Sequence, residues 1–375
     1  MRIGIDARFL THPQRGGFKS YTTTLVSSLA EVDTVNEYIL YTDRIDNQLP
    51  ALPSNFTIKP VTALTAITRE QFALPSAMRK DNVDIAHYLC NTAPITSHMP
   101  MIVTIHDAIP LHNSGKHTGR LNAKHKALRT YWRGVMPRAA STAELIVTNT
   151  RYSQSDIMSV LNVAEDKFRV VHPAISDAFI KSDIDKHPVE MPKTVPYIMC
   201  FAAMDGRKNH QTAIAAFKEI SAEFPDLHLV LVCSHDNIKE QLKHEHGDRF
   251  LPIGPLVIEE LVWLYKNSRT LIFPSFDEGF GLPPLEAMTC GTPVIASNSG
   301  SLPEVLGDAA ILVETHDSAA ISRGLRKLLT DDEFVKHMVS LGKNRSHLFT
   351  HQKMGRGLLG AYQEVFNLSR KRPSS

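Results

Sequence analysis

The chain has 375 residues, of which 43% are hydrophobic and 21% are charged, and its formal net charge is +2. This length exceeds what one hydrophobic core usually serves, so we expect two domains. The near-neutral balance provides no general attraction for nucleic acid, and no apolar run is long enough to cross a membrane. The chain begins directly with a strand pattern and lacks the pattern of a signal peptide, which predicts a cytoplasmic protein.

The four cysteines, Cys90, Cys200, Cys233 and Cys290, are widely separated and have apolar neighbours. Neither a disulfide framework nor a zinc site has this spacing. We therefore expect reduced cysteines in the core.

The first part of the chain alternates strand and helix patterns. After a strand at residues 2–7, the turn Gly16-Gly17 precedes a helical repeat of apolar residues. Further strand patterns lie at residues 37–42, 56–61, 83–87, 101–106, 145–149 and 168–172. This alternation predicts a doubly wound parallel sheet with ligands at the carboxyl ends of its strands. His106 and Asp107 lie at such an end, although a lone histidine there is more often structural.

A basic helix candidate follows between Gly115 and Ala139. It contains seven basic residues and no acidic residue: Lys116, Arg120, Lys124, Lys126, Arg129, Arg133 and Arg138. A basic helix with aromatic residues can meet anionic lipid or a phosphorylated acceptor, or its charges can simply be solvated. The sequence leaves these interpretations open.

Residues 181–196 are polar and interrupted by prolines, which is typical of a linker between domains. They include Asp183-Ile184-Asp185, and an Asp-x-Asp pattern can hold a diphosphate through a cation. No apolar strand leads into this pattern, so we interpret it as incidental and expect no metal site.

The alternating pattern restarts with a strand at residues 197–203, which is followed by Arg207-Lys208-Asn209. Adjacent arginine and lysine at the carboxyl end of a strand suit a diphosphate, because arginine can pair with two oxygens and lysine supplies a compact charge. A solvated charge pair in a turn is the structural alternative.

A second glycine turn lies in the stretch 277–288, after an apolar strand at residues 270–274. Gly279 and Gly281 allow the backbone to approach a ligand closely, and the amides that begin the next helix suit an anion. Glu278 and Glu286 flank this helix start, where a carboxylate can accept hydrogen bonds from ribose hydroxyls. Further on, Ser301-Leu302-Pro303-Glu304 has the pattern of a capping box.

The spacing of Glu278 and Glu286 resembles the signature of retaining family-4 glycosyltransferases with the GT-B fold. Seven residues separate the two glutamates, within the motif E-G-F-G-L-P-x-L-E-A-M. The run Cys290–Ala296 and the Arg-Lys-Asn after the strand are also similar to that family. The resemblance implies two doubly wound Rossmann-like α/β domains that face a cleft. We expect an acceptor domain at residues 1–180, a linker at 181–196, a nucleotide-sugar domain at 197–355 and a last helix at 356–375 that crosses back.

The resemblance also assigns site residues. It implies that Glu278 contacts the donor sugar, that Glu286 contacts the ribose hydroxyls, and that the strand-end histidine approaches the donor sugar. The expected catalytic residues are Glu278, His106, Arg207 and Lys208, and the expected donor-binding residues are Gly16, Gly17, Ile253, Phe280, Gly281, Leu282 and Glu286.

The function that follows is transfer of a hexose, glucose or mannose, from a nucleotide-diphosphate sugar to a glycan or lipid-linked acceptor in polysaccharide biosynthesis. We expect retention of configuration and no metal or other cofactor. The nucleotide, uridine or guanosine, stays open, as does peripheral contact of residues 115–139 with an anionic inner membrane face. The alternatives are a non-catalytic nucleotide-sugar-binding partner subunit and a nucleotide-sugar 2-epimerase of the same fold, a class that lacks the Glu-x7-Glu pattern.

Overall fold

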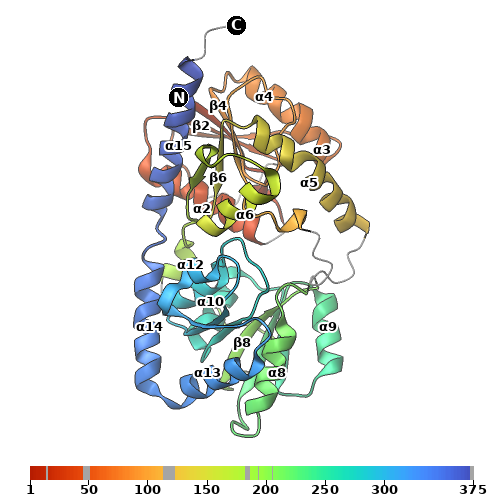
Figure 1. The fold of residues 1–375 in the computed structure, drawn as a ribbon, viewed down its shortest axis with the longest axis vertical. Coiled ribbons are helices and arrows are strands. Elements are labelled where there is room, and N and C mark those ends of the chain that lie inside the picture. Colours follow the sequence, from red (N-terminus) through yellow and green to blue (C-terminus); the bar gives the residue numbers. More distant parts are fainter. Residues whose placement is uncertain are drawn as a thin grey trace. The chain divides into compact units, whose positions relative to one another are not determined.

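The computed structural model describes residues 1–13, 16–44, 51–112, 123–181, 186–192, 194–204 and 206–371. The chain divides into two compact units. Unit 1 contains Met1–His112, Ala123–Ala174 and the C-terminal residues from Phe349, and unit 2 contains Ile175–Leu348. Figure 1 shows that the last helix, in blue, belongs with the first strands of the chain.

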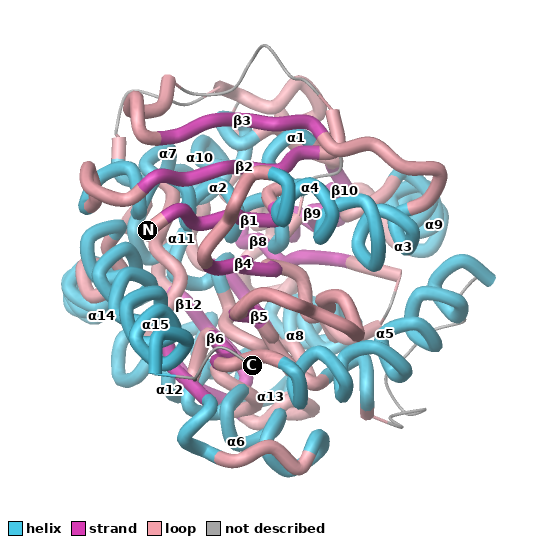
Figure 2. Tube along the Cα trace, turned by 90° about the horizontal axis from the view of Figure 1, so that it is seen from above, coloured by secondary structure: helices cyan, strands magenta, loops and turns pink. Residues whose placement is uncertain are grey.

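Unit 1 is built on a sheet of seven parallel strands in the order β3-β2-β1-β4-β5-β6-β7 (Figure 2). The strands are β1 (Arg2–Asp6), β2 (Glu37–Thr42), β3 (Phe56–Pro60), β4 (Ile85–Tyr88), β5 (Met101–Thr104), β6 (Leu145–Thr148) and β7 (Phe168–Val170). In the central pair β1 and β4, Ile3 lies opposite Ile85. The strand order reverses between β1 and β4, and such a reversal opens a crevice at the carboxyl ends of the two strands.

Helices on both sides cover this sheet, which is why its central strands are buried on both faces. They are α1 (Arg8–Thr11), α2 (Gly17–Val32), α3 (Ala66–Thr68), the π-helix η1 (Arg69–Ala73), α4 (Leu74–Lys80), the 3-10 helix η2 (Ile109–Leu111), α5 (Ala123–Thr142), α6 (Arg151–Leu161), the 3-10 helix η3 (Glu165–Lys167) and α15 (His351–Lys371). Helix α15 packs closely on α2: a Cβ at Gly355 would lie 2.5 Å from the carbonyl oxygen of Ser28.

Unit 2 has a sheet of six parallel strands in the order β10-β9-β8-β11-β12-β13. The strands are β8 (Tyr197–Ala202), β9 (His228–Cys233), β10 (Phe250–Ile253), β11 (Leu271–Phe273), β12 (Val294–Ser297) and β13 (Ile311–Val313). Here the order reverses between β8 and β11. Both sheets are therefore doubly wound, and the predicted fold class is confirmed.

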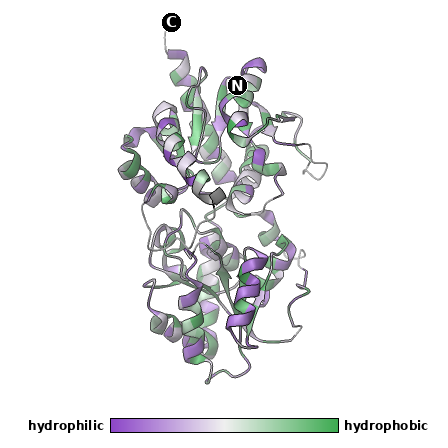
Figure 3. Ribbon diagram, turned by 90° about the vertical axis from the view of Figure 1, so that its right-hand side faces the viewer, coloured by the Kyte–Doolittle hydropathy of each residue, from purple (hydrophilic) through white to green (hydrophobic). Residues whose placement is uncertain are grey.

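The helices of unit 2 are amphipathic, and Figure 3 shows hydrophilic and hydrophobic residues alternating along the helices. They are α7 (Asp177–Ile180), α8 (His210–Ile220), α9 (Asp236–Glu245), α10 (Ile258–Asn267), α11 (Leu282–Thr289), α12 (Leu302–Leu306), the 3-10 helix η4 (Gly307–Ala309), α13 (Ser318–Thr330) and α14 (Asp332–Ser346). Their apolar faces and the sheet form one core, in which Phe217, Leu231 and Leu325 are almost completely buried.

Some boundaries differ from those expected from the sequence. The units divide between Ala174 and Ile175, so the described residues of the segment 181–196 lie within unit 2. The last helix begins at His351, because the apolar positions that pack against α2 extend further toward the N-terminus than the repeat suggested. Asp183 and Asp185 lie outside the described residues. Among the helices of the described ranges, none has both the length and the hydropathy that a membrane crossing requires.

Three of the four cysteines, Cys90, Cys200 and Cys233, are buried free thiols, and Cys290 is partly exposed. Burial raises the pKa of the Cys200 thiol to about 12, which makes the thiolate negligible at neutral pH. The buried thiols behave as small apolar residues of the core.

Candidate functional site

The candidate site of unit 2 lies at the carboxyl edge of its sheet, where the strand order reverses between β8 and β11. The loop after β8 carries Arg207 and Lys208, and the loop after β11 carries Glu278. These two loops follow neighbouring parallel strands. Side chains that are 70 residues apart in the chain therefore meet at one edge.

Glu278 is paired with both cations. Lys208 Nζ lies 2.7 Å from Oε1 of Glu278, and Arg207 Nη1 lies 3.3 Å from Oε2. Glu278 is only 8% exposed. Burial raises the pKa of this carboxyl, but Lys208 and then Arg207 lower it further than burial raises it, so the net pKa is below the usual value and Glu278 is ionised at neutral pH. The group of three carries an excess of one positive charge.

Backbone contacts fix the loop that holds Glu278. The Ser301 hydroxyl donates to the Glu278 carbonyl oxygen at 2.7 Å, and the Ser299 hydroxyl donates to the carbonyl oxygen of Phe276 at 2.6 Å. A Cβ at Gly300 would lie 2.9 Å from the Glu278 amide nitrogen, so the two loops approach as closely as glycine allows. The expected capping box at Ser301 is wrong: its side chain makes no cap hydrogen bond to α12, because it is used on Glu278.

The third residue of the Arg-Lys-Asn run has a structural role that the sequence did not indicate. Asn209 has φ +50° and is the residue immediately before α8. Its side-chain amide donates to the carbonyl oxygens of Pro274 (3.0 Å) and Thr315 (2.6 Å). It therefore ties the loop after β8, which presents Arg207 and Lys208, to the loop after β11.

Helix α11 is preceded by a glycine that no other residue can replace without strain. Gly281 has φ +97°, and a Cβ there would lie 2.5 Å from Cδ2 of Leu302. Phe280 is buried, Leu282 is the first helical residue, and prolines follow it as the sequence predicted. Pro283 and Pro284 have no N–H group, so Leu282 is the one of the first three helical residues that carries an amide N–H. The helix dipole adds a positive potential at this end of α11.

Glu286 lies on the second turn of α11 and is partly buried. The Tyr265 hydroxyl from α10 donates to its Oε2 at 3.1 Å. Burial raises the pKa of Glu286 to about 7, although the hydrogen bond from Tyr265 and the charge of Lys208 both oppose this rise. One carboxylate oxygen is thus held by Tyr265, and Lys208 acts electrostatically on Glu286 as well as on Glu278. Tyr265 was not identified from the sequence, where it is one apolar position in a helical repeat.

Ile253 ends β10 and is only 2% exposed. Its side chain belongs to the core, so only its backbone and the following turn are available at this edge. There the Gly254 amide donates to Oε2 of Glu190 at 3.2 Å.

The remaining predicted residues belong to unit 1. Gly16, with φ +137°, precedes α2, and Gly17 begins it. A Cβ at either glycine would have no heavy atom of the described residues within 4 Å, so among these residues nothing crowds either position. The start of α2 can therefore accommodate a ligand group or a rearrangement of the turn.

His106 follows β5, and protein groups hold its ring at both nitrogens. Its Nε2 donates to the Leu89 carbonyl oxygen at 2.8 Å, so Nδ1 is the acceptor for the side-chain amide of Asn149 at 3.0 Å. The ring edge also contacts Tyr21 and Phe18, with centroids 4.5 Å and 5.2 Å away. Burial lowers the pKa of His106 to about 4, so the ring is neutral at pH 7. A direct contact of the ring nitrogens with a substrate requires exchange of one of these hydrogen bonds.

Helix α5 contains part of the basic segment 115–139. Arg129 donates to the carbonyl oxygens of Pro110 and His112, and Arg133 also donates to His112. Arg138 is exposed. Lys116 and Arg120 lie outside the described residues, so part of this basic surface rests on the sequence alone.

Among the described residues, no group of three His, Cys, Asp or Glu side chains is arranged to hold a metal ion.

The predicted site residues fall into two groups. The structure brings five of them together at one edge of unit 2: Glu278, Arg207, Lys208, Gly281 and Glu286. The residues Gly16, Gly17 and His106 lie in unit 1.

Comparison with known families matches both halves of the chain. The model described as Glycosyltransferase Family 4 matches residues 15–179, and the model described as Glycosyl transferases group 1 matches residues 181–345. The chain is 30% identical over 244 residues to O-antigen chain mannosyltransferase B of Escherichia coli, which covers 62% of this chain and 64% of that protein. It is 28% identical over 251 residues to the serotype-specific mannosyltransferase WbdA of the same organism, covering 63% of this chain and 30% of that protein.

The alignments thus span less than two thirds of these relatives. Among solved structures, sucrose-phosphate synthase from Thermosynechococcus elongatus is similar with a TM-score of 0.74 and 17% identity, covering 98% of this chain and 100% of that chain. At this identity the similarity concerns the fold.

Proposed function

Because the chain belongs to the family-4 glycosyltransferases with the GT-B fold, we propose that it transfers a hexose from a nucleotide-diphosphate sugar to a glycan. The observation that supports this most is the cluster of Glu278 with Arg207 and Lys208 at the carboxyl edge of the second sheet, beside the start of α11. Its excess positive charge suits a diphosphate, and its carboxylate suits a sugar hydroxyl.

The proposed reaction breaks the bond between the anomeric carbon and the diphosphate oxygen, so negative charge grows on the departing diphosphate. Arg207 and Lys208, together with the Leu282 amide at the start of α11, are the groups of unit 2 that are proposed to stabilise this charge. One such donor is typically worth about 3 to 4 kcal/mol of transition-state stabilisation. A helix start without neighbouring cations would not favour this chemistry.

Glu286 is proposed to accept hydrogen bonds from the ribose hydroxyls. Its Oε2 already accepts from Tyr265, which leaves Oε1 for a ligand. Since a ribose contact is made equally in the ground state and the transition state, it contributes to donor affinity rather than to turnover.

We propose retention of configuration, in which the acceptor hydroxyl attacks the anomeric carbon on the face of the leaving group. The new glycosidic bond forms as the bond to the diphosphate breaks, and the leaving phosphate oxygen takes the acceptor proton. Because protein cations compensate the diphosphate charge, the proposed mechanism uses no metal ion.

Mannose is the first sugar to test, because the relatives above carry mannosyltransferase names, and glucose is the second. The acceptor is proposed to be a glycan of polysaccharide biosynthesis, free or lipid-linked. In the lipid-linked case, residues 115–139 would contact an anionic membrane. Vesicle sedimentation tests this: binding to anionic vesicles at low salt, lost in a Lys124→Glu, Lys126→Glu double variant, supports it, and no binding at low salt refutes it.

Thermal-shift measurements with GDP-mannose, UDP-glucose and the free nucleotides test the proposed function. A ligand at about 100 times its dissociation constant adds about 2.7 kcal/mol of stability. Stabilisation followed by slow release of free sugar without acceptor supports a transferase. Stabilisation with no release of sugar over hours would favour the non-catalytic partner subunit, and a 2-epimerised sugar product would favour the epimerase.

A further inference from the structure

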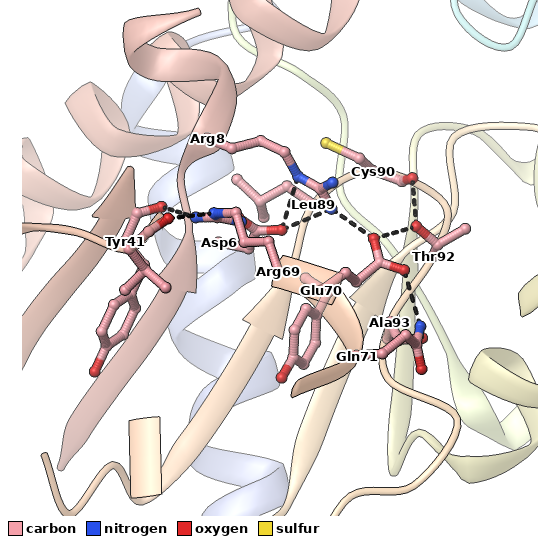
Figure 4. A network of polar contacts seen from close by, with 12 residues as sticks. Asp6, Arg8, Tyr41, Arg69, Glu70, Gln71, Leu89, Cys90, Thr92 and Ala93 are labelled. Carbon is pink, nitrogen blue, oxygen red and sulfur yellow. Dashed lines mark hydrogen bonds and ion pairs between the residues drawn. The ribbon is translucent and has the colours of Figure 1, made fainter. Parts of the chain in front are cut away.

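A buried polar cluster lies at the carboxyl edge of unit 1, where the strand order reverses between β1 and β4. Asp6 ends β1, Arg8 begins α1, and Glu70 lies in the π-helix η1 (Figure 4). Thr92, four residues beyond the end of β4, completes this group. A reversal point in a doubly wound sheet is where such folds bind ligands, and π-helical turns are frequent at functional sites.

The two carboxylates of this cluster are buried, and each accepts at least two hydrogen bonds. Asp6 accepts from Arg69 Nη1 at 2.8 Å and from Arg8 Nε at 2.9 Å. Glu70 accepts from Arg8 Nη2 and the Thr92 hydroxyl, each at 2.7 Å. The Tyr131 hydroxyl of α5 also donates to Glu70 at 2.7 Å. These carboxylates are therefore occupied in holding the two arginines and are not available to a ligand.

The two arginines differ in how many of their guanidinium nitrogens donate hydrogen bonds. Arg69 is 5% exposed at its side chain, and all its nitrogens donate: to Val61, Tyr41 and Thr42 carbonyl oxygens and to Asp6. Arg8 is 15% exposed at its side chain and donates through Nε and Nη2. Within the described part of the chain, Arg8 Nη1 makes no hydrogen bond. Arg8 is thus held in place by its other two nitrogens, and its Nη1 can donate to a ligand.

The charge of the cluster selects the kind of ligand. Asp6 and Glu70 balance Arg8 and Arg69, and both carboxylates approach Arg8 Nη2 to within 2.8 Å. A phosphate or carboxylate brought to Arg8 would find no uncompensated positive charge, because both arginines are already paired with buried carboxylates. A neutral hydroxyl oxygen needs no such charge and can accept from the remaining N–H of Arg8.

Aromatic residues follow Arg8 in the chain, on α1 and at the start of α2. Phe9, the next residue of α1, stacks on Phe18 with a centroid distance of 5.2 Å, and His12 lies 5.5 Å from Phe9. Phe9 and Phe18 are partly exposed. A rigid ring beside a polar donor suits a sugar, which presents an apolar face of C–H groups and a rim of hydroxyls.

We propose that Arg8 binds a hydroxyl of a neutral saccharide acceptor at the reversal point of the first sheet, and that Asp6 and Glu70 hold its guanidinium in place. This rests on the proposed function, because it takes the activity to be glycosyl transfer. It adds the chemical class of the acceptor, a neutral and hydroxyl-rich ligand rather than a phosphorylated one, and the residue that recognises it.

The test compares the wild type with Arg8→Lys, which keeps the positive charge between Asp6 and Glu70 but removes the guanidinium fork. The probes are α-linked mannobiose as the neutral acceptor and mannose 6-phosphate as the anionic one, with GDP-mannose and UDP-glucose as donors. We expect mannobiose to be used by the wild type, and Arg8→Lys to raise its half-saturating concentration about tenfold. This is the loss expected for a hydrogen bond from a charged donor. Donor hydrolysis without acceptor should be unchanged.

Tyr131→Phe is the matched control, since it removes a hydrogen bond from Glu70 on the side away from Arg8 and should leave acceptor use unchanged. Equal effects of Tyr131→Phe and Arg8→Lys would overturn the proposal, because they would indicate a general loosening of the cluster. So would an unchanged half-saturation in Arg8→Lys, or a wild type that prefers mannose 6-phosphate. If the wild type hydrolyses neither donor, the proposed function itself fails; if it hydrolyses donor but ignores mannobiose, only the inference about Arg8 fails.

Discussion

The reversal points of the two sheets occupy the same place in the same topology, yet they are charged differently. At the edge of unit 2, Arg207 and Lys208 form ion pairs with one carboxylate, Glu278, so this group of three has one positive charge in excess. At the edge of unit 1, two arginines face two buried carboxylates and the sum is zero. The fold provides both crevices, and the side chains of two short loops decide what each can bind. An excess cation suits a diphosphate donor, and a balanced cluster suits a neutral acceptor.

The largest expected effect is on stability and comes from the balanced edge. Arg69→Ala leaves the fully buried Asp6 with Arg8 as its remaining cation. Breaking a buried ion pair in this way typically costs about 3 to 5 kcal/mol. We expect this loss in urea unfolding, with donor hydrolysis per folded molecule unchanged. Wild-type stability combined with lost hydrolysis would instead place Arg69 in the chemistry.

Arg207→Ala should show the opposite behaviour at the charged edge. Its side chain is 29% exposed and its partner keeps Lys208, so the stability change should be small. Turnover should fall about 100-fold or more, because its charge matters most as the diphosphate departs. Steady-state kinetics with saturating donor measure this. Near-normal turnover would remove Arg207 from the site.

Glu286→Gln is expected to raise the Michaelis constant for the donor about tenfold, with less effect on the turnover of bound donor. A large loss of turnover at unchanged Michaelis constant would assign Glu286 to the chemical step. Kinetics at pH 8, where the wild-type carboxylate is mostly ionised, give the clearest comparison.

The same variant has a pH-dependent effect on stability. The pKa of Glu286 is raised by folding to about 7, so its protonated form is favoured in the folded state. The stability that Glu286 contributes in this way is fully present below the pKa it has in the unfolded chain, and it is lost as the pH rises through 7. The melting temperature of Glu286→Gln relative to the wild type should therefore rise between pH 5 and pH 8. A difference that is constant over this range would show that the pKa of Glu286 is not raised.

Tyr265→Phe should have the smallest effect. It removes the hydrogen bond to Oε2 of Glu286, and a net hydrogen bond of about 0.5 to 1.5 kcal/mol corresponds to a rise of roughly 2- to 10-fold in the donor Michaelis constant. Tyr197→Phe is the matched control, because the Tyr197 hydroxyl donates to the Leu264 carbonyl oxygen of the same helix, α10. Equal effects of the two variants would mean that Tyr265 acts through packing.

The sequence predicted the fold class because both sheets depend on local periodicity. Strand β2 (Glu37–Thr42) has the predicted bounds, and most other strands differ by one or two residues at an end. The proximity of Glu278 to Arg207 and Lys208 was also accessible, since strand ends of a doubly wound sheet must meet at one edge.

Long-range polar contacts were not accessible in this way. Tyr265, Gly300 and Ser301 act on the Glu278 and Glu286 segments through tertiary contacts, and their local patterns indicate only an apolar helix and a cap. The cluster of unit 1 joins Asp6 to Arg69 and Glu70 across more than 60 residues. No periodicity connects such positions, so only the folded chain shows that their charges cancel.

The central claim, that the edge of unit 2 carries the chemistry of a retaining, metal-independent transfer, is tested most directly by ¹H NMR of donor hydrolysis. The wild type and Arg207→Ala would be incubated in EDTA with GDP-mannose or UDP-glucose, whose sugars are α-linked. We predict that the wild type releases the α anomer first and that Arg207→Ala releases it more slowly, by a factor of about 100 or more. Initial release of the β anomer, or activity that EDTA abolishes and magnesium restores, would contradict this claim.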